Sequence, residues 1–162
     1  MTIHNDHICC FTGHRSINQE HQDKLAILLD NLLDKLIAHG VTQFRAGGAI
    51  GFDTIAALKI IEKKKKYPHI KLHLILPCKN QAERWNDLCR ATYQYTLDMA
   101  DSITYVSEMY VSGCMLKRNR CLVDGSQFCI AYCLSEGGGT AYTLNYAKEH
   151  GLRTINLATM LE

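Results

Sequence analysis

Short, continuous apolar runs alternate with longer amphipathic segments along the whole chain. Residues 8–11 and 128–134 are apolar throughout, which is typical of strands buried on both faces of a parallel sheet. Between such runs, apolar residues recur at helical spacing, as in the leucine-rich segment 25–37. This alternation predicts an α/β fold, a Rossmann-like three-layer sandwich with a mostly parallel sheet and helices on both faces.

The same pattern predicts the order of the elements. We expect strands at 8–11, 41–46, 70–76, 102–106, 128–134 and 154–157. Helices are expected between them, at about 53–66, 81–100, 113–123 and 140–150, after a first helix that carries the 25–37 stripe and ends near Gly40. Because the connections are short and no repeat is visible, residues 1–162 are expected to form a single domain.

The composition is that of an ordinary globular protein, with 47% hydrophobic residues and a net charge of +2. No apolar stretch approaches the ~20 residues of a membrane span, and the polar first residues do not resemble a secretory signal. The eight cysteines include no Cys-x-x-Cys pair, and several lie in apolar runs where a free thiol packs well. We therefore expect a cytoplasmic protein without a metal site, a bound cofactor or a membrane partner.

Three polar or glycine-rich segments follow directly after predicted strands, at 12–15, 47–53 and 136–140. In a doubly wound sheet the ligand binds outside the carboxyl ends of the strands, where all three would lie. Glycines there leave backbone amides bare at a helix N-terminus, where the helix dipole favours an anion. An arginine such as Arg15 can grip a phosphate with two hydrogen bonds. The residues of these turns expected to bind a ligand are Gly13, His14, Arg15, Gly47, Gly48, Gly51, Asp53, Gly137, Gly138, Gly139 and Thr140.

Two common nucleotide-binding motifs are absent from these turns. None of the turns has the Gly-x-Gly-x-x-Gly spacing of nicotinamide dinucleotide sites, and no suitable acidic residue follows the first strand. The Lys-Ser/Thr ending of a P-loop is missing as well. The sequence therefore argues against NAD binding and against ATP hydrolysis.

Four motifs, in order along the chain, resemble one superfamily. Phe-Thr-Gly-His-Arg at 11–15 is similar to the start of the short YpsA/YoqJ-like branch. Gly-Gly-Ala-Ile-Gly-Phe-Asp at 47–53 and Arg-Asn-Arg at 118–120 resemble segments of the DNA-processing protein DprA. Gly-Gly-Gly-Thr at 137–140 is similar to a loop of the LOG phosphoribohydrolases, which release a base from a nucleoside monophosphate. The chain is thereby identified as a member of the SLOG superfamily, which implies a Rossmann-like fold that binds nucleotides or nucleotide-derived ligands.

The resemblance adds Arg118 and Asn119 to the expected ligand-binding residues and leaves three functions open. The first is binding or sensing of a nucleotide-type small molecule, with no settled reaction. The second is a LOG-like phosphoribohydrolase that cleaves the N-glycosidic bond of a nucleoside monophosphate. The third is DprA-like binding of single-stranded DNA, which the small net charge disfavours. A second copy of the chain and another protein are further candidate partners.

An enzymatic function would require a carboxylate near the ligand. Cleavage of an N-glycosidic bond builds positive charge on the sugar, which a nearby carboxylate stabilises. LOG enzymes carry glutamates shortly after their Gly-Thr, whereas residues 141–145 here are Ala-Tyr-Thr-Leu-Asn. The candidate catalytic residues are therefore Glu136, just before the glycines, and Asp53.

Several of these residues also have an ordinary structural explanation. Asp53 would serve as the N-cap of the helix that follows it. His14 would either contact a phosphate or hold its own loop. Trp85, in the helix predicted at 81–100, would pack at the edge of the core or stack on a base. The lysine run 63–66 would offset the dipole of a helix C-terminus and face solvent.

Overall fold

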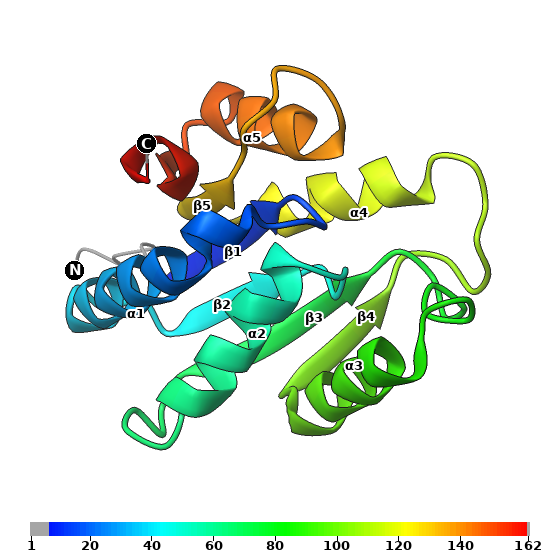
Figure 1. The fold of residues 1–162 in the computed structure, drawn as a ribbon, viewed down its shortest axis with the longest axis horizontal. Helices are drawn as coiled ribbons and strands as arrows, with labels where there is room; N and C mark the ends of the chain where they lie inside the picture. The colour runs from blue at the N-terminus through cyan, green and yellow to red at the C-terminus, as the bar shows by residue number, and fades with distance from the viewer. Residues whose placement is uncertain (1–6, 162) are drawn as a thin grey trace, which may run out of the picture.

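The computed structural model describes residues 7–161 and confirms an α/β fold built on one parallel six-stranded sheet, with the strand order β4-β3-β2-β1-β5-β6 (Figure 1). The strands are β1 (Ile8–Gly13), β2 (Gln43–Ala46), β3 (Lys71–Leu76), β4 (Ser102–Tyr105), β5 (Phe128–Tyr132) and β6 (Arg153–Asn156). The helices are α1 (Gln22–Ala38), α2 (Phe52–Lys63), α3 (Asp87–Met99), α4 (Cys114–Val123) and α5 (Gly139–Glu149), with short 3-10 turns at Gln19–His21 and Leu157–Met160.

The strand order explains how the helices divide between the two faces of the sheet. From β1 to β4 the chain moves in one direction, and right-handed crossovers place α1, α2 and α3 on the same face. The chain then returns to the other side of β1, so α4 and α5 cover the opposite face (Figure 1). The two directions diverge between β1 and β5, which is the point where such sheets bind their ligands.

Aromatic and leucine side chains build the core between α1, α2 and the sheet. The ring of Phe11 stacks on Phe44 with centroids 6.1 Å apart, and Phe52 of α2 stacks on Tyr132 of β5 at 6.2 Å. The apolar stripe of α1 is buried as predicted, and its fully buried members are Leu25, Leu29 and Leu33. Because complete burial of a leucine side chain contributes about 2 kcal/mol, this stripe fixes α1 on the sheet.

The segment before α3 differs from the prediction. The helix expected at 81–100 begins only at Asp87, because Asn86 caps it: the Asn86 side-chain oxygen accepts a hydrogen bond from the amide of Cys89 at 2.8 Å. Most of residues 79–86 form turns instead. Trp85 therefore lies just before the helix rather than on it.

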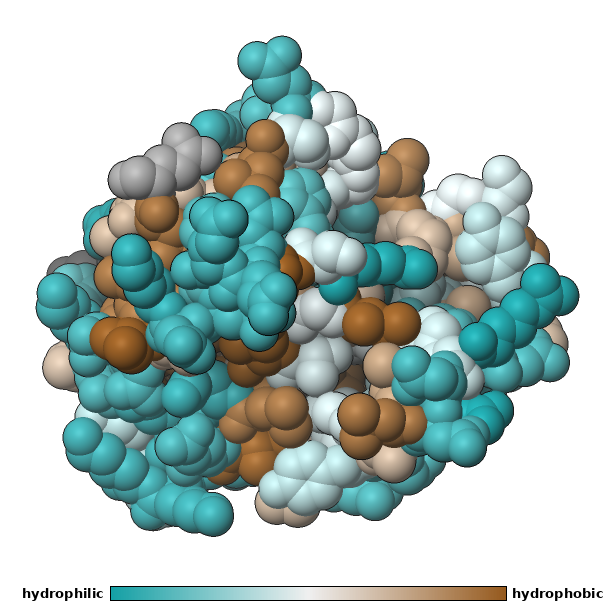
Figure 2. All heavy atoms as spheres, viewed as in Figure 1, coloured by the Kyte–Doolittle hydropathy of each residue, from teal (hydrophilic) through white to brown (hydrophobic). Residues whose placement is uncertain are grey.

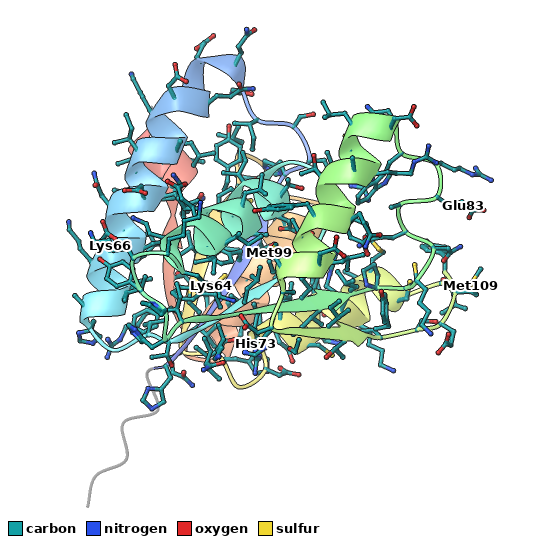
Figure 3. All side chains as sticks on the ribbon, turned by 90° about the horizontal axis from the view of Figure 1, so that it is seen from below. Lys64, Lys66, His73, Glu83, Met99 and Met109 are labelled. Atoms are coloured by element: carbon teal, nitrogen blue, oxygen red, sulfur yellow. The ribbon has the colours of Figure 1, made fainter. Side chains whose placement is uncertain are left out.

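The lysine run at the end of α2 is only partly exposed. Lys63 is buried, and its ammonium group forms ion pairs with Asp30 at 2.9 Å and Asp34 at 2.8 Å, both on α1. Lys64, labelled in Figure 3, pairs with Asp101 at 2.6 Å. The expectation that the whole run faces solvent is wrong, because these two lysines connect α2 to α1 and to the start of β4.

The surface seen in Figure 2 is mainly hydrophilic, with apolar side chains scattered between the polar ones, as on ordinary protein surfaces. No helix within residues 7–161 is long and apolar enough to span a membrane. All eight cysteines are free thiols, and most of them are buried. In the part of the chain that the structure describes, no group of three or more His, Cys, Asp or Glu side chains is placed to hold a metal ion.

Candidate functional site

The carboxyl ends of β2, β1 and β5 are neighbours in the sheet, so the three turns expected to bind a ligand come together. A cavity of about 290 Å³ lies among the β1 turn, the start of α2, the helix α4 and the start of α5. Eight of the expected ligand-binding residues line it, namely Gly13, His14, Arg15, Asp53, Arg118, Asn119, Gly139 and Thr140.

The other expected residues do not line this cavity; they are Gly47, Gly48, Gly51, Trp85, Glu136, Gly137 and Gly138. Glu136 is exposed to solvent. Of the two candidate catalytic carboxylates, only Asp53 therefore reaches the cavity. Trp85 lines two neighbouring hollows instead.

Glycines of the first two turns serve close packing between β1 and α2. A Cβ atom at Gly13 would lie 2.4 Å from the Cβ of Phe52. Gly51 has a φ of +87°, and a Cβ there would lie 2.3 Å from the carbonyl oxygen of Arg15. The amide of Phe52 in turn donates a hydrogen bond to the carbonyl oxygen of His14 at 3.1 Å. Close packing between the β1 turn and α2 is therefore enough to require a glycine at both positions.

The loop before α5 is the open one of the three. No other part of the protein lies within 4 Å of a Cβ atom built at Gly137 or Gly138. The helix begins at Gly139, and the amides of Gly139 and Thr140 donate to no acceptor within residues 7–161. Free amides and the positive end of the helix dipole thus face the cavity, and both favour an anion.

Arg118 of α4 is almost completely buried, with 4% of its surface exposed. Its Nη1 donates to the carbonyl oxygen of Gly47, and its Nε donates to Oδ1 of Asn119 at 2.8 Å. A Cβ atom at position 47 would lie 2.7 Å from Nη1 of Arg118 and 2.8 Å from Oδ2 of Asp53. Gly47 therefore leaves room for both the guanidinium and the carboxylate, which crowd the place that a Cβ would take.

Asp53 lies in the first turn of α2 and is 5% exposed. Its Oδ2 accepts a hydrogen bond from the amide of Ala49 at 3.2 Å. The N-cap of α2 is Gly51, so the capping role expected of Asp53 is wrong. Burial raises the pKa of the Asp53 carboxyl to about 6, although the charges of Arg118 and Arg15 favour its ionised form. Near neutral pH this carboxyl can exchange a proton inside the cavity.

His14 connects the β1 turn to the loop before α5. Its Nε2 accepts a hydrogen bond from the amide of Leu134 at 2.7 Å, and its own amide donates to the carbonyl oxygen of Tyr132 at 3.2 Å. Burial lowers the pKa of the imidazole, which keeps it neutral with its proton on Nδ1. The loop-holding role considered for His14 is thus present, while its ring also lines the cavity.

Part of one wall of the cavity was missed in the sequence: Met115, Leu116 and Leu122 were not among the expected residues. Met115, Arg118, Asn119 and Leu122 of α4 all line it, together with the partly exposed Leu116. Residues 115, 118, 119 and 122 follow the i, i+3, i+4, i+7 spacing of one helix face. That spacing, applied to the Arg-Asn-Arg motif, was the available signal that α4 turns this face towards the cavity.

The fold and the position of the cavity define a Rossmann-like α/β protein with a cavity at the carboxyl ends of the strands. The model of the YpsA family, described as the YspA SLOG family, matches residues 9–161. The chain therefore belongs to the YpsA family of the SLOG superfamily, and the relationship expected from its motifs is confirmed.

Two relatives are similar to the chain over most of their length. The SPbeta prophage-derived protein YoqJ of Bacillus subtilis is 34% identical over 140 residues, which cover 79% of this chain and 80% of YoqJ. A UPF0398 protein of Bacillus pumilus is 28% identical over 135 residues, covering 82% of this chain and 73% of the relative.

Solved structures share the fold at lower identity. DprA of Streptococcus pneumoniae has a TM-score of 0.66 at 15% identity, and the match covers 91% of this chain but only 49% of the DprA chain. DprA of Helicobacter pylori, whose structure describes its single-stranded DNA binding mode, has a TM-score of 0.63 at 18% identity. The match covers 92% of this chain and 64% of the DprA chain. The structural-genomics target TM1055 has a TM-score of 0.57 at 15% identity. At these identities the similarity shows the fold alone.

Proposed function

We propose that the chain binds a nucleotide or a nucleotide-derived ligand in the cavity between β1, α4 and α5. The observation that carries this proposal is the cavity itself, about 290 Å³ in volume, which combines an open helix N-terminus with Arg15 and Thr140. Its size is close to the lower end of the ~300–1,000 Å³ typical of small-molecule sites.

The phosphate group would bind at the start of α5. There it would accept hydrogen bonds from the free amides of Gly139 and Thr140 and from the Thr140 hydroxyl. Arg15 is exposed and forms no ion pair within residues 7–161, so its guanidinium is available to a phosphate. Arg118 is held by Gly47 and Asn119 and would supply positive potential rather than a direct grip.

The sugar would lie deeper, between α2 and α4. Asp53 and Asn119 line that part of the cavity, and a carboxylate and an amide are suitable partners for ribose hydroxyls. Met115, Leu116 and Leu122 provide an apolar wall for a flat base on the same side of the sheet.

Calorimetric titration with nucleoside monophosphates, supported by thermal-shift assays, tests the proposal. We expect binding to the intact protein and at least a tenfold weaker affinity in Arg15→Ala, because a charge-assisted hydrogen bond is worth about 1.5–3 kcal/mol. Lys24→Ala, an exposed cation on α1, is the matched control and should bind normally. Failure of every nucleoside monophosphate to bind or to shift the melting temperature would contradict the proposal.

Asp53 favours a second candidate function, a phosphoribohydrolase. In that reaction water adds to C1′ of the ribose and the base leaves with a proton; a carboxylate beside the sugar stabilises the developing positive charge. The exposed Glu136 lies outside the cavity and would have no part in it. Incubation with nucleoside monophosphates should then release free base, Asp53→Asn should abolish the release, and Glu136→Ala should leave it unchanged. An intact protein that binds nucleotides but releases no base would rule this candidate out.

A further inference from the structure

Arg15 lines the candidate site and two further hollows, both of which also include Trp85. Besides the candidate site, it lines an apolar hollow of about 380 Å³ between the start of α2 and the start of α3. The apolar walls of this hollow, which we call the Trp85 hollow, are Ile17, Ile50, Ile55, Trp85 and Leu88. A ligand that extends past Arg15 towards the starts of α2 and α3 therefore meets an apolar surface.

Trp85 is placed like a stacking platform. It is half-buried and belongs to none of the core clusters, and its ring meets the edge of Tyr93 with centroids 5.2 Å apart. In the same hollow, Leu88 has 77% of its surface exposed. A flat aromatic group beside these two side chains would cover apolar surface that otherwise faces water.

The loop that carries Trp85 is braced rather than free. It packs against the loop that follows β4, and Figure 3 shows Glu83 and Met109 on these two projecting segments. The amide of Tyr110 donates to Oδ1 of Asn80 at 2.9 Å, and the amide of Lys79 donates to the carbonyl oxygen of Glu108 at 3.0 Å. The platform is thus preorganised, which reduces the entropy lost on binding.

We infer that the ligand consists of two nucleosides joined through phosphate, with one nucleotide in the candidate site, the linking phosphate at Arg15 and the second base on Trp85. The inference rests on the proposed function and extends it to the size of the ligand. Arg15 has no ion-pair partner among the described residues, so its charge is available to the linkage. Gln22, which also lines the Trp85 hollow, offers an amide to the edge of the second base.

Trp85 is the single tryptophan of the chain, so its fluorescence reports directly on this hollow. The probes are adenosine monophosphate, the dinucleotide pApA with a 3′–5′ linkage, and diadenosine diphosphate with a 5′–5′ linkage. At least one dinucleotide should quench the fluorescence strongly, whereas the mononucleotide should bind and leave it nearly unchanged. The two dinucleotides distinguish the two linkages.

Calorimetry with variants completes the test. The preferred dinucleotide should bind about tenfold more tightly than the mononucleotide, the ratio expected for one stacked base. Trp85→Ala should abolish this ratio without changing the affinity for the mononucleotide, and Trp85→Phe should retain most of it. The unchanged mononucleotide affinity also shows that the variant is folded.

The failures of the two proposals are distinguishable. If the mononucleotide binds but neither dinucleotide binds more tightly or quenches more, the two-base ligand is wrong and the proposed function stands. If the mononucleotide quenches as strongly as a dinucleotide, one base already occupies the Trp85 hollow and the two-base ligand is again wrong. If no probe binds, both proposals are wrong.

Discussion

Nε2 of His14 accepts a hydrogen bond from the backbone amide of Leu134 at 2.7 Å, and this contact joins the turn after β1 to the loop that leads into α5. The turn lines the candidate site, and the loop leads to Gly139 and Thr140, which line it as well. An imidazole can accept at Nε2 only while it is neutral, so the geometry of the site depends on the protonation state of one side chain.

Stability should fall in mildly acidic solution because of His14. Burial lowers its pKa below the ordinary value of 6.5, so the unfolded chain takes up a proton more readily than the folded one. The contribution of the neutral His14 to the free energy of unfolding is fully present above about pH 6.5, and it is lost as the pH falls through the pKa of the folded protein. We expect the free energy of unfolding, measured with urea, to fall more steeply between pH 8 and 5.5 for the intact protein than for His14→Gln.

His14→Gln is a suitable comparison because glutamine can accept the same hydrogen bond but does not titrate. His73, whose pKa burial also lowers, contributes equally to both proteins and cancels. Identical pH dependence of the two proteins would show that His14 is not held neutral by the fold.

Gly51→Ala should be strongly destabilising. The residue has a φ of +87°, and a Cβ there would lie 2.3 Å from a backbone oxygen. Gly151→Ala is the matched control, since Gly151 has a φ of +79° and no neighbour within 4 Å. Chemical denaturation should show that the control lowers the free energy of unfolding by about 1–2 kcal/mol. Gly51→Ala should lower it by clearly more. Equal losses would mean that the β1 and α2 turns separate easily.

The carboxyl of Asp53 should titrate at about pH 6, as measured by carbon-detected NMR. Arg118→Met should raise this pKa further, because the buried guanidinium favours the ionised carboxylate. Arg120→Met, which removes a half-buried charge on the same helix that does not act on Asp53, should leave it unchanged. A midpoint near pH 4 would contradict the buried position of Asp53 in the cavity.

Much of the fold could be predicted because buried parallel strands are apolar throughout. The runs at β1 and β5 and the leucine stripe of α1 contain enough information to predict a parallel sheet with helices on both faces. The start of a helix is harder to predict from the sequence. The residues before α3 had suggested a longer helix, but Asn86 caps α3 and its first residue is Asp87.

Eight of the expected ligand-binding residues line one cavity, but local sequence patterns did not reveal all the contacts that these turns make. Gly13 and Gly51 were expected to leave room for phosphate, and the structure adds a second reason for them, the close packing of α2 against the β1 turn, which the sequence does not show. The same limit applies to Lys63, whose acidic partners lie on α1, about 30 residues away in the chain. Long-range contacts of this kind decide side-chain roles that local sequence patterns leave open.

The central claim is that a phosphate group binds at the start of α5, and amide NMR tests it most directly. Adenosine monophosphate and adenosine are titrated separately into the labelled protein while the backbone amides of Gly139 and Thr140 are followed. We predict large shifts of both amides with the monophosphate and small ones with the nucleoside. A monophosphate that binds while these two amides remain unchanged would contradict the account.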